Sequence, residues 1–378
     1  MRLTLRALTV LCLVTLIGGA AARAQTAAAT AAPPDRAALE KKVDEFLNAH
    51  ARVNSFSGSV LIAKDGTPLL SKGYGFANIE WQIPNTPQTK FRIGSITKQF
   101  TSMLIMQLRE QGKVTLEDSL CVYVTPCPDP WKPVTVHHLL THTSGIPTYT
   151  GQKAWAEKMM MPLTPDQVMG FVRDLPLQWV PGEKYAYNNS GYFLLGLIIE
   201  KATGKKYEAA LAEMILTPLA LKDTGYDWTR TILPRRAAGY SGRGPALGNA
   251  MPIDMQQPYA AGSMYSTVED LLEWDQSLYT TTLLPEAAKT VMWTPFLNNY
   301  AYGWNIGQAD PKLFGGHRRM AHAGGINGFS SVLIRLPDVK MTFIVLANND
   351  GANAAVIGRD LAALYFGQPY SIPSPAAK

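Results

Sequence analysis

Patterns typical of β-strands lie at both ends of this chain, and the residues between them have mostly helical patterns. Four apolar runs of strand length occur at residues 56–63, 68–74, 330–335 and 341–347. Turn residues join each pair, Lys64 to Thr67 in the first and Leu336 to Asp338 in the second. Hairpins this far apart in sequence bury their apolar faces most simply in one sheet. The pattern predicts an α/β (α+β) fold, with an antiparallel sheet built from both termini, flanking helices and a large, mostly helical inserted domain.

The helical part is predicted from apolar residues at helical spacing. The stretch from Ser95 to Gln111 is apolar on nearly every side and Gly112 marks its end, so this helix belongs in a protein interior. Shorter helices are predicted at residues 136–140, 165–173, 190–201, 207–215 and 267–278, and amphipathic helices at 35–51 and 354–365. We expect one domain at 36–367, its sheet part at about 36–90 and 300–367, its helical part at about 91–299, and an irregular tail at 368–378.

The first 24 residues have the pattern of an export signal. Arg2 and Arg6 precede an apolar run at 7–16 that is too short to span a bilayer, and Ala22 to Ala24 fits the A-x-A cleavage pattern. We predict cleavage after Ala24 and a flexible leader at 25–35. No later apolar run approaches the length of a membrane span. The mature chain is expected to be periplasmic or secreted, without a transmembrane segment.

Charge and cysteine content narrow the possible partners. The formal net charge is +6, and loss of the signal removes three arginines. The remaining charges are scattered without a basic stripe, which argues against nucleic acid as a partner. An oxidising compartment would let Cys121 and Cys127 form a disulfide around a proline-containing loop, and two buried thiols are the alternative.

Ser95 and Lys98 form an S-x-x-K pattern at the start of the predicted interior helix. A serine hydroxyl needs a nearby base to act as a nucleophile near neutral pH. Residues three apart lie on one face of a helix, so Lys98 can reach Ser95. Burial lowers the pKa of a lysine and makes its neutral, basic form accessible. The pattern alone is weak, and its significance depends on two patterns further along the chain.

The second pattern is Tyr187-x-Asn189, on a predicted turn before an apolar helix. A phenol beside an amine can exchange a proton with a serine and with a leaving group, and a carboxamide can position a substrate amide or ester. An ordinary turn, in which asparagine tolerates unusual backbone angles, is the alternative interpretation.

The third pattern is His322-x-Gly324-Gly325, just before a predicted strand. Glycines beside a strand let a substrate backbone approach closely, and a free backbone N–H there could bind an oxyanion together with that of Ser95. His322 would offer a donor, in its cationic form if protonated, to a substrate carboxylate or to the tyrosine. The alternative is a hydrogen-bonded structural imidazole.

These three patterns, in this order, resemble the motifs of the penicillin-recognising serine hydrolases. The resemblance is to the branch with class C β-lactamases, DD-carboxypeptidases and family VIII esterases, which have a β-lactamase/transpeptidase-like fold. The resemblance covers about residues 40–366, and further matching stretches lie at 91–95, 139–147, 181–196, 261–267 and 302–304.

The resemblance implies catalytic roles for Ser95, Lys98 and Tyr187, with Ser95 as the acylated nucleophile and the other two as a proton-transferring pair. It implies substrate binding by Asn189, His322, Gly324 and Gly325, with an oxyanion hole from the N–H groups of Ser95 and Gly325. It also implies no metal or organic cofactor. One departure stands out: β-lactamases of this branch typically have lysine at position 322, and histidine is mostly neutral near pH 7. Histidine there resembles the peptidase and esterase members and argues against efficient β-lactam turnover.

The substrate predicted from the sequence is a small molecule or peptide, either a D-amino-acid peptide, a β-lactam or an ester. A D-alanyl-D-alanine carboxypeptidase-like or β-lactamase-related activity comes first, and a family VIII carboxylesterase is the alternative. A non-catalytic relative that binds peptidoglycan or a partner is disfavoured by the four intact motif residues.

Three further interpretations concern residues outside the motifs. A zinc site at His137, His138 and His142 lacks the glutamate of H-E-x-x-H. No G-x-S-x-G elbow of an α/β-hydrolase occurs. Four aromatic residues could line an acyl pocket: Tyr149, Trp155, Tyr300 and Trp304. The alternative is that they belong to the core, where aromatic residues are found more often.

Overall fold

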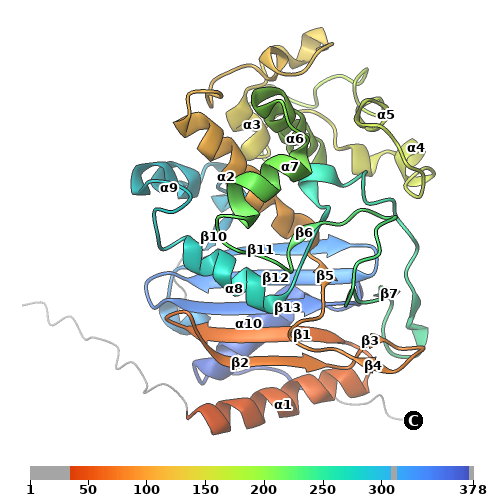
Figure 1. Cartoon of the computed structure of the whole chain (residues 1–378), viewed down its shortest axis with the longest axis vertical. Coiled ribbons are helices and arrows are strands. Elements are labelled where there is room, and N and C mark those ends of the chain that lie inside the picture. The colour runs from red at the N-terminus through yellow and green to blue at the C-terminus, as the bar shows by residue number, and fades with distance from the viewer. Residues whose placement is uncertain (1–34, 308–312, 374–378) are drawn as a thin grey trace, which may run out of the picture. The chain divides into compact units, whose positions relative to one another are not determined.

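The centre of the computed structural model is a six-stranded antiparallel sheet, shown in the lower half of Figure 1. The structure describes residues 35–307 and 313–373. The strands follow the order β10-β11-β12-β13-β1-β2. Their bounds are Asn305–Gly307, Arg319–Ile326, Phe329–Leu336, Met341–Ala347, Gly58–Lys64 and Thr67–Tyr74. The predicted sheet from both ends of the chain is therefore confirmed.

The N-terminal and C-terminal hairpins join at the β1–β13 pair. Gly58 lies opposite Ala347 and Lys64 opposite Met341, so the two strands pair along their whole length. Both strands are buried on both faces, which explains why they read as nearly continuous apolar runs rather than alternating ones.

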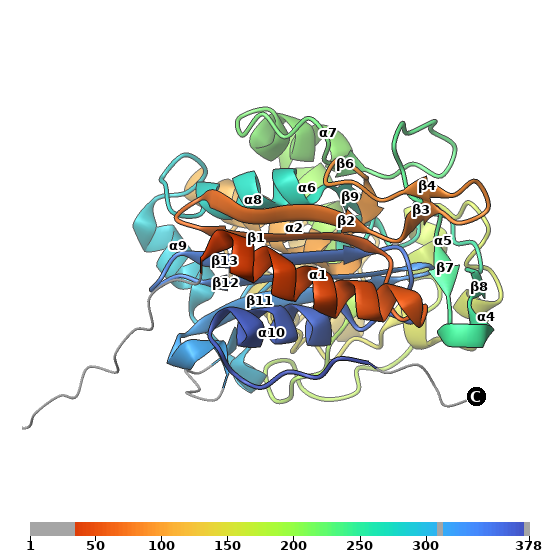
Figure 2. The same cartoon turned by 90° about the horizontal axis from the view of Figure 1, so that it is seen from below.

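Two helices cover one face of the sheet, as Figure 2 shows from below. They are α1 (Arg36–Arg52) and α10 (Ala354–Tyr365). Asp35 caps the start of α1 by accepting from the N–H of Ala38, and the buried residues of α1 recur at helical spacing. Side chains of both helices join alternate sheet residues such as Val345 in one apolar core.

The other face of the sheet carries the helical part, with α2 (Thr97–Glu110) at its centre. All but three residues of α2 are buried, as expected for a helix that is apolar on nearly every side. It packs against α6 (Asn189–Thr203), which begins at the cap Asn188 and ends at Gly204 in the left-handed conformation. The remaining helices are α3 (Val136–Leu140), α4 (Lys153–Ala156), α5 (Pro165–Met169), α7 (Tyr207–Leu211), α8 (Val268–Ser277) and α9 (Glu286–Trp293).

Short strands form three small sheets beside the six-stranded one. β3 pairs with β4, β7 pairs with β8, and a three-stranded sheet in the order β5-β9-β6 lies just before α2 in the chain. The short strands are β3 (Phe76–Asn78), β4 (Ile83–Pro84), β5 (Phe91–Arg92), β6 (Gly225–Tyr226), β7 (Tyr240–Ser241), β8 (Gly248–Asn249) and β9 (Met264–Ser266).

Several predicted boundaries differ from the structure. Ser95 lies in a 3-10 turn, Gly94–Ile96, because Gly94 adopts a positive φ of 50° and the α-helix begins only at Thr97. The helix predicted at 165–173 ends at Met169, and the one predicted at 207–215 continues beyond Leu211 as a π-helical turn.

Cys121 and Cys127 form the predicted disulfide, with their Cα atoms 5.3 Å apart. In the described part of the chain, no helix has the length and apolar character needed to cross a membrane. The predicted signal peptide at 1–24 and nearly all of the leader lie outside the described residues.

Candidate active site

Ser95 is held at the sheet edge by the turn that precedes α2. Gly94 packs so closely on β11 that a Cβ there would lie 2.9 Å from the backbone nitrogen of Gly325. The turn therefore brings Ser95 beside the third motif, although more than 200 residues separate them in the chain. Three residues make one turn of a 3-10 helix, so Ser95 and Lys98 still share a face.

Lys98 is fully buried, and its Nζ lies within hydrogen-bond distance of three oxygens. They are Ser95 Oγ at 3.0 Å, Asn189 Oδ1 at 2.9 Å and the Ala261 carbonyl at 2.8 Å. The S-x-x-K pair and the asparagine of the second motif thus meet at one nitrogen.

The partners of Lys98 fit a neutral amine. The Ala261 carbonyl and the Asn189 amide oxygen can only accept, so they take the two N–H groups of a neutral amine. The remaining lone pair can then accept the hydroxyl proton of Ser95. Burial lowers the pKa of Lys98 well below its ordinary value, and no carboxylate in the described part of the chain counteracts it. The site is built to hold a basic lysine beside a serine.

Tyr187 lies over this lysine at the mouth of the site. Its ring centroid is 4.8 Å from Lys98 Nζ, and 40% of the residue is exposed toward the opening. Burial of the phenol raises the pKa of Tyr187, and the Ser95 hydroxyl partly offsets this shift. The phenol is therefore protonated at neutral pH and can donate a proton.

Asn189 is the first residue of α6, and its side chain bonds to Lys98 and lines the same cavity as Ser95. Its Nδ2 donates to Thr150 Oγ1 at 3.1 Å, while its Oδ1 accepts from Lys98. These bonds fix the orientation of the carboxamide and leave its second amide hydrogen for another acceptor.

His142, a member of the family-matching stretch 139–147 that was also weighed as a zinc ligand, supports the second motif. Its Nδ1 accepts from the N–H of Asn188 at 3.1 Å, and its carbonyl accepts from the N–H of Ala186 at 3.0 Å. The backbone on both sides of Tyr187 is thereby tied to one residue, and the two rings lie 4.4 Å apart. The backbone of His142 has a φ of 59°, which is rare for a residue with a side chain.

The other histidines considered as zinc ligands bond to different groups. His137 Nδ1 lies 2.8 Å from the Tyr302 hydroxyl, and His138 Nδ1 accepts from the N–H of Thr135 at 3.1 Å. These bonds belong to the protein's own hydrogen-bond network.

The sequence predicts that His322 offers a free hydrogen-bond donor to a substrate carboxylate or to the tyrosine, and the structure differs. His322 Nδ1 lies 2.6 Å from the Ala323 carbonyl and its Nε2 lies 2.8 Å from the Tyr300 hydroxyl, so both ring nitrogens are occupied. Burial lowers the pKa of His322 to about 3, with a further contribution from Lys98. The ring is neutral and has no N–H left for a substrate carboxylate.

The two glycines of the third motif have different surroundings. A Cβ on Gly324 would lie 2.0 Å from the Ile93 carbonyl oxygen. The close approach that the sequence predicts for a substrate backbone is therefore made at Gly324 by the protein's own chain. A Cβ on Gly325 would meet nothing within 4 Å. Gly324 lets β11 pack against the Ser95 turn, and Gly325 faces open space beside Ser95.

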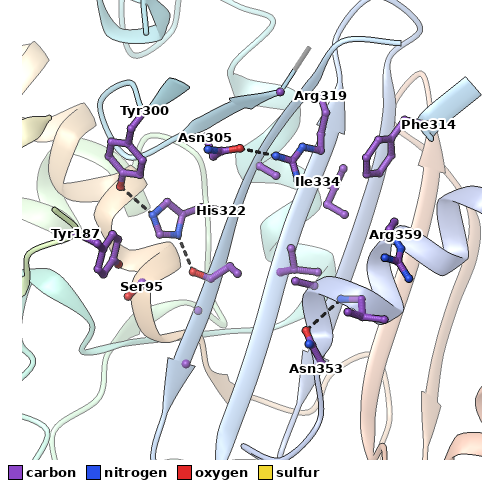
Figure 3. A pocket seen from close by; sticks show the side chains of 18 of the residues that line it. Ser95, Tyr187, Tyr300, Asn305, Phe314, Arg319, His322, Ile334, Asn353 and Arg359 are labelled. Carbon is purple, nitrogen blue, oxygen red and sulfur yellow. Dashed lines mark hydrogen bonds between the residues drawn. The ribbon is translucent and has the colours of Figure 1, made fainter. Parts of the chain in front are cut away.

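A cavity of about 1310 Å³ opens at these residues. Its lining includes Ser95, Tyr187, Asn189, Tyr300, His322 and Gly325. Figure 3 shows that its lining extends along the sheet to Arg319, at the start of β11, and to Arg359 of α10. Of the aromatic residues singled out in the sequence, Tyr300 lines this cavity, Tyr149 and Trp155 line a smaller pocket beside Ser95, and Trp304 is buried in the core.

The fold and the site together define a serine hydrolase of the type that includes penicillin-binding proteins, amidases and esterases. The chain belongs to the Beta-lactamase family, whose profile matches residues 39–367. The family resemblance seen in the sequence is thereby confirmed.

Three relatives illustrate the range of this family. Penicillin-binding protein 4* of Bacillus subtilis is 30% identical over 350 residues, covering 86% of this chain and 76% of the relative. Teichoic acid D-alanine hydrolase of Staphylococcus aureus is 32% identical over 235 residues, covering 61% of this chain and 55% of the relative. The structure of a D-stereospecific amidohydrolase from Streptomyces sp. is similar with a TM-score of 0.72 and 27% identity, covering 89% and 100% of the two chains.

Proposed function

We propose that this protein hydrolyses neutral amides or esters of D-amino acids through an acyl-enzyme at Ser95. The observation that carries the proposal is the 3.0 Å contact between Ser95 Oγ and the buried amine of Lys98. No carboxylate among the described residues stabilises the charged form of this amine. A charged lysine could not accept the serine proton, whereas a neutral one can.

In the acylation step, Ser95 Oγ attacks the substrate carbonyl while its proton passes to the Lys98/Tyr187 pair. We assign the base to the pair as a unit, since Lys98 Nζ lies 4.8 Å from the centroid of the Tyr187 ring and the Ser95 hydroxyl interacts with both side chains. The N–H groups of Ser95 and Gly325 would bind the oxyanion, and the free amide hydrogen of Asn189 would bind a substrate carbonyl. Tyr187 then donates a proton to the leaving nitrogen or oxygen.

In the deacylation step, a water molecule attacks the ester of Ser95 from the cavity. The same pair would accept the proton of that water and return it to Ser95 Oγ, since microscopic reversibility makes the acid of one step the base of the next. The exposed edge of Tyr187 faces the opening from which water and substrate enter.

A neutral His322 cannot pair with a substrate carboxylate, which favours substrates that have no carboxylate next to the scissile bond. Two relatives support the D-amino-acid class, one named as a D-stereospecific amidohydrolase and the other as a teichoic acid D-alanine hydrolase. We therefore rank D-aminoacyl amides and esters ahead of D-alanyl-D-alanine carboxypeptidase activity. β-Lactams are expected to acylate Ser95 more readily than they turn over.

We further propose that the protein is exported. The signal pattern of residues 1–24, the Cys121–Cys127 disulfide and the relatedness to a penicillin-binding protein support this location. Cell fractionation with detection of a mature chain starting at Gln25 tests it. A chain that stays in the cytoplasm with its first 24 residues attached would contradict it.

The activity is tested by parallel turnover of four substrates: D-alanine amide, a short p-nitrophenyl ester, a D-Ala-D-Ala peptide and nitrocefin. We expect a higher kcat/KM for the D-amide and the ester than for the other two, and no turnover by Ser95→Ala. L-Alanine amide serves as the stereochemical control beside these four substrates. Preference for L-alanine amide over the D-amide, or activity that survives Ser95→Ala, would refute the proposal.

A further inference from the structure

Tyr300 is a buried residue at the wall of the active-site cavity. Its side chain points toward the third motif, and Figure 3 shows its hydroxyl bonded to the His322 ring. The residue follows a short 3-10 turn, Leu297–Asn299, and only 3% of it is exposed. None of the three sequence motifs contains it.

The direction of the Tyr300–His322 hydrogen bond follows from the other bond of the ring. A backbone carbonyl can only accept, so Nδ1 of His322 must donate to Ala323 and therefore carries the proton. The neutral ring then has a lone pair on Nε2, and the Tyr300 hydroxyl donates to it at 2.8 Å. The tyrosine occupies the one ring atom that could otherwise take up a proton.

The groups around His322 keep it neutral. Lys98 from α2 and His142 from the segment after α3 interact with it as positive charges when they are protonated. The phenols of Tyr187 and Tyr300 lie on its other sides, with ring centroids 6.1 Å and 5.8 Å away. Among the described residues, no carboxylate contributes to the titration of His322.

We propose that Tyr300 is a specificity-determining residue that withholds His322 from substrate carboxylates and thereby restricts the site to neutral substrates. This inference deepens the proposed function and rests on its preference for neutral amides and esters. Removing the hydroxyl exposes the Nε2 lone pair beside the cavity. A carboxylate can then bind there together with one proton taken from solvent, which makes a charge-assisted hydrogen bond.

The test compares a carboxylate with its neutral counterpart in protein that cannot turn either over. In a Ser95→Ala background, the Kd values of N-acetyl-D-alanine and N-acetyl-D-alaninamide are measured at pH 6 and pH 8, with and without Tyr300→Phe. We expect Tyr300→Phe to strengthen carboxylate binding relative to amide binding about tenfold at pH 6, the size of one hydrogen bond to a charged group. This gain in relative carboxylate affinity should be smaller at pH 8, because binding of the carboxylate takes up a proton.

The matched control is Tyr185→Phe, which removes a hydroxyl from the same cavity wall without a bond to His322. Its ratio of carboxylate to amide affinity should not change. An unchanged ratio in Tyr300→Phe, or an equal change in Tyr185→Phe, would overturn the inference.

A second readout holds even if neither ligand binds. Nitrogen-15 NMR of His322 should show the Nδ1–H tautomer without titration between pH 5 and 8, and Tyr300→Phe should raise its pKa because the bond that stabilises the neutral ring is lost. An Nε2–H tautomer in the folded wild-type protein would refute the inference. Absence of turnover of any of the four test substrates by the wild-type protein, by contrast, would refute only the proposed function.

Discussion

Replacing Lys98 with methionine should change how the stability of the protein depends on pH. Lys98 is fully buried and burial lowers the pKa of its amine, so the folded protein holds this lysine neutral. In the unfolded chain the amine returns to water, where lysine has its ordinary pKa of about 10.4. Methionine has a similar length but cannot titrate.

The magnitude follows from one proton. Between the lowered pKa of folded Lys98 and about 10.4, the unfolded wild-type chain binds one proton more than the folded chain. The free energy of unfolding of the wild-type protein therefore rises by about 1.4 kcal/mol per pH unit relative to Lys98→Met. A base at neutral pH must be neutral in the folded protein from pH 7 upward. With Lys98 in that state, the difference between the two proteins changes by about 3 kcal/mol in favour of the wild type between pH 7 and pH 9.

Urea unfolding at pH 7, 8 and 9 measures this difference, because contributions of all other groups cancel between the two proteins. Lys113→Met, at an exposed lysine, is the control, and its difference from the wild type should not depend on pH. Parallel pH profiles for wild type and Lys98→Met would show that Lys98 is charged in the folded protein. That result would refute its assignment as a base.

Substitutions at His142 and Gly324, each with a matched second variant, test the supports of the site. His142→Phe keeps a ring beside Tyr187 but leaves the N–H of Asn188 without an acceptor, a cost of about 1–3 kcal/mol. We expect kcat of His142→Phe to fall about ten- to a hundredfold at constant KM. His142→Asn should recover most of this activity, since asparagine can accept the hydrogen bond from Asn188 and tolerates a positive φ. Equal losses of kcat in both variants would contradict the role of His142 in supporting the second motif. Gly324→Ala should lower the free energy of unfolding by about 1–3 kcal/mol and abolish turnover, because its Cβ would lie 2.0 Å from the Ile93 oxygen. Gly325→Ala, where nothing lies within 4 Å, should leave the melting temperature unchanged, and equal melting temperatures for both alanine variants would argue against the packing role of Gly324.

Much of the fold could be predicted because its signals are local. The hairpins at both ends have turn residues between apolar runs, and burial on both faces makes the β1 and β13 runs continuous. The position of Ser95 and Lys98 on one face could also be predicted, because a 3-10 turn brings residues three apart together as an α-turn does. The exact start of α2 could not, since it depends on a positive φ at Gly94.

The supports of the site were not predictable in the same way. Tyr300 and His142 act through contacts with residues 22 and 46 positions away in the chain, and no local pattern marks such pairs. The role of Gly324 depends on contact with Ile93, which comes from a distant part of the chain. His322 was expected to donate because its type allows it, and its neutral state follows only from burial and two hydrogen bonds. Residue types therefore indicated the chemistry, and long-range contacts determine its selectivity.

Ser95 should be the nucleophile that forms the covalent intermediate. Intact-mass spectrometry of the folded protein after reaction with a β-lactam, which acylates serine, and with a fluorophosphonate, which phosphonylates it, tests this assignment when peptide mapping follows. We expect one adduct per chain on Ser95, strongly reduced in Lys98→Met and absent in Ser95→Ala. Folded protein without an adduct, or an adduct on another residue, would contradict the assignment of Ser95 as the nucleophile.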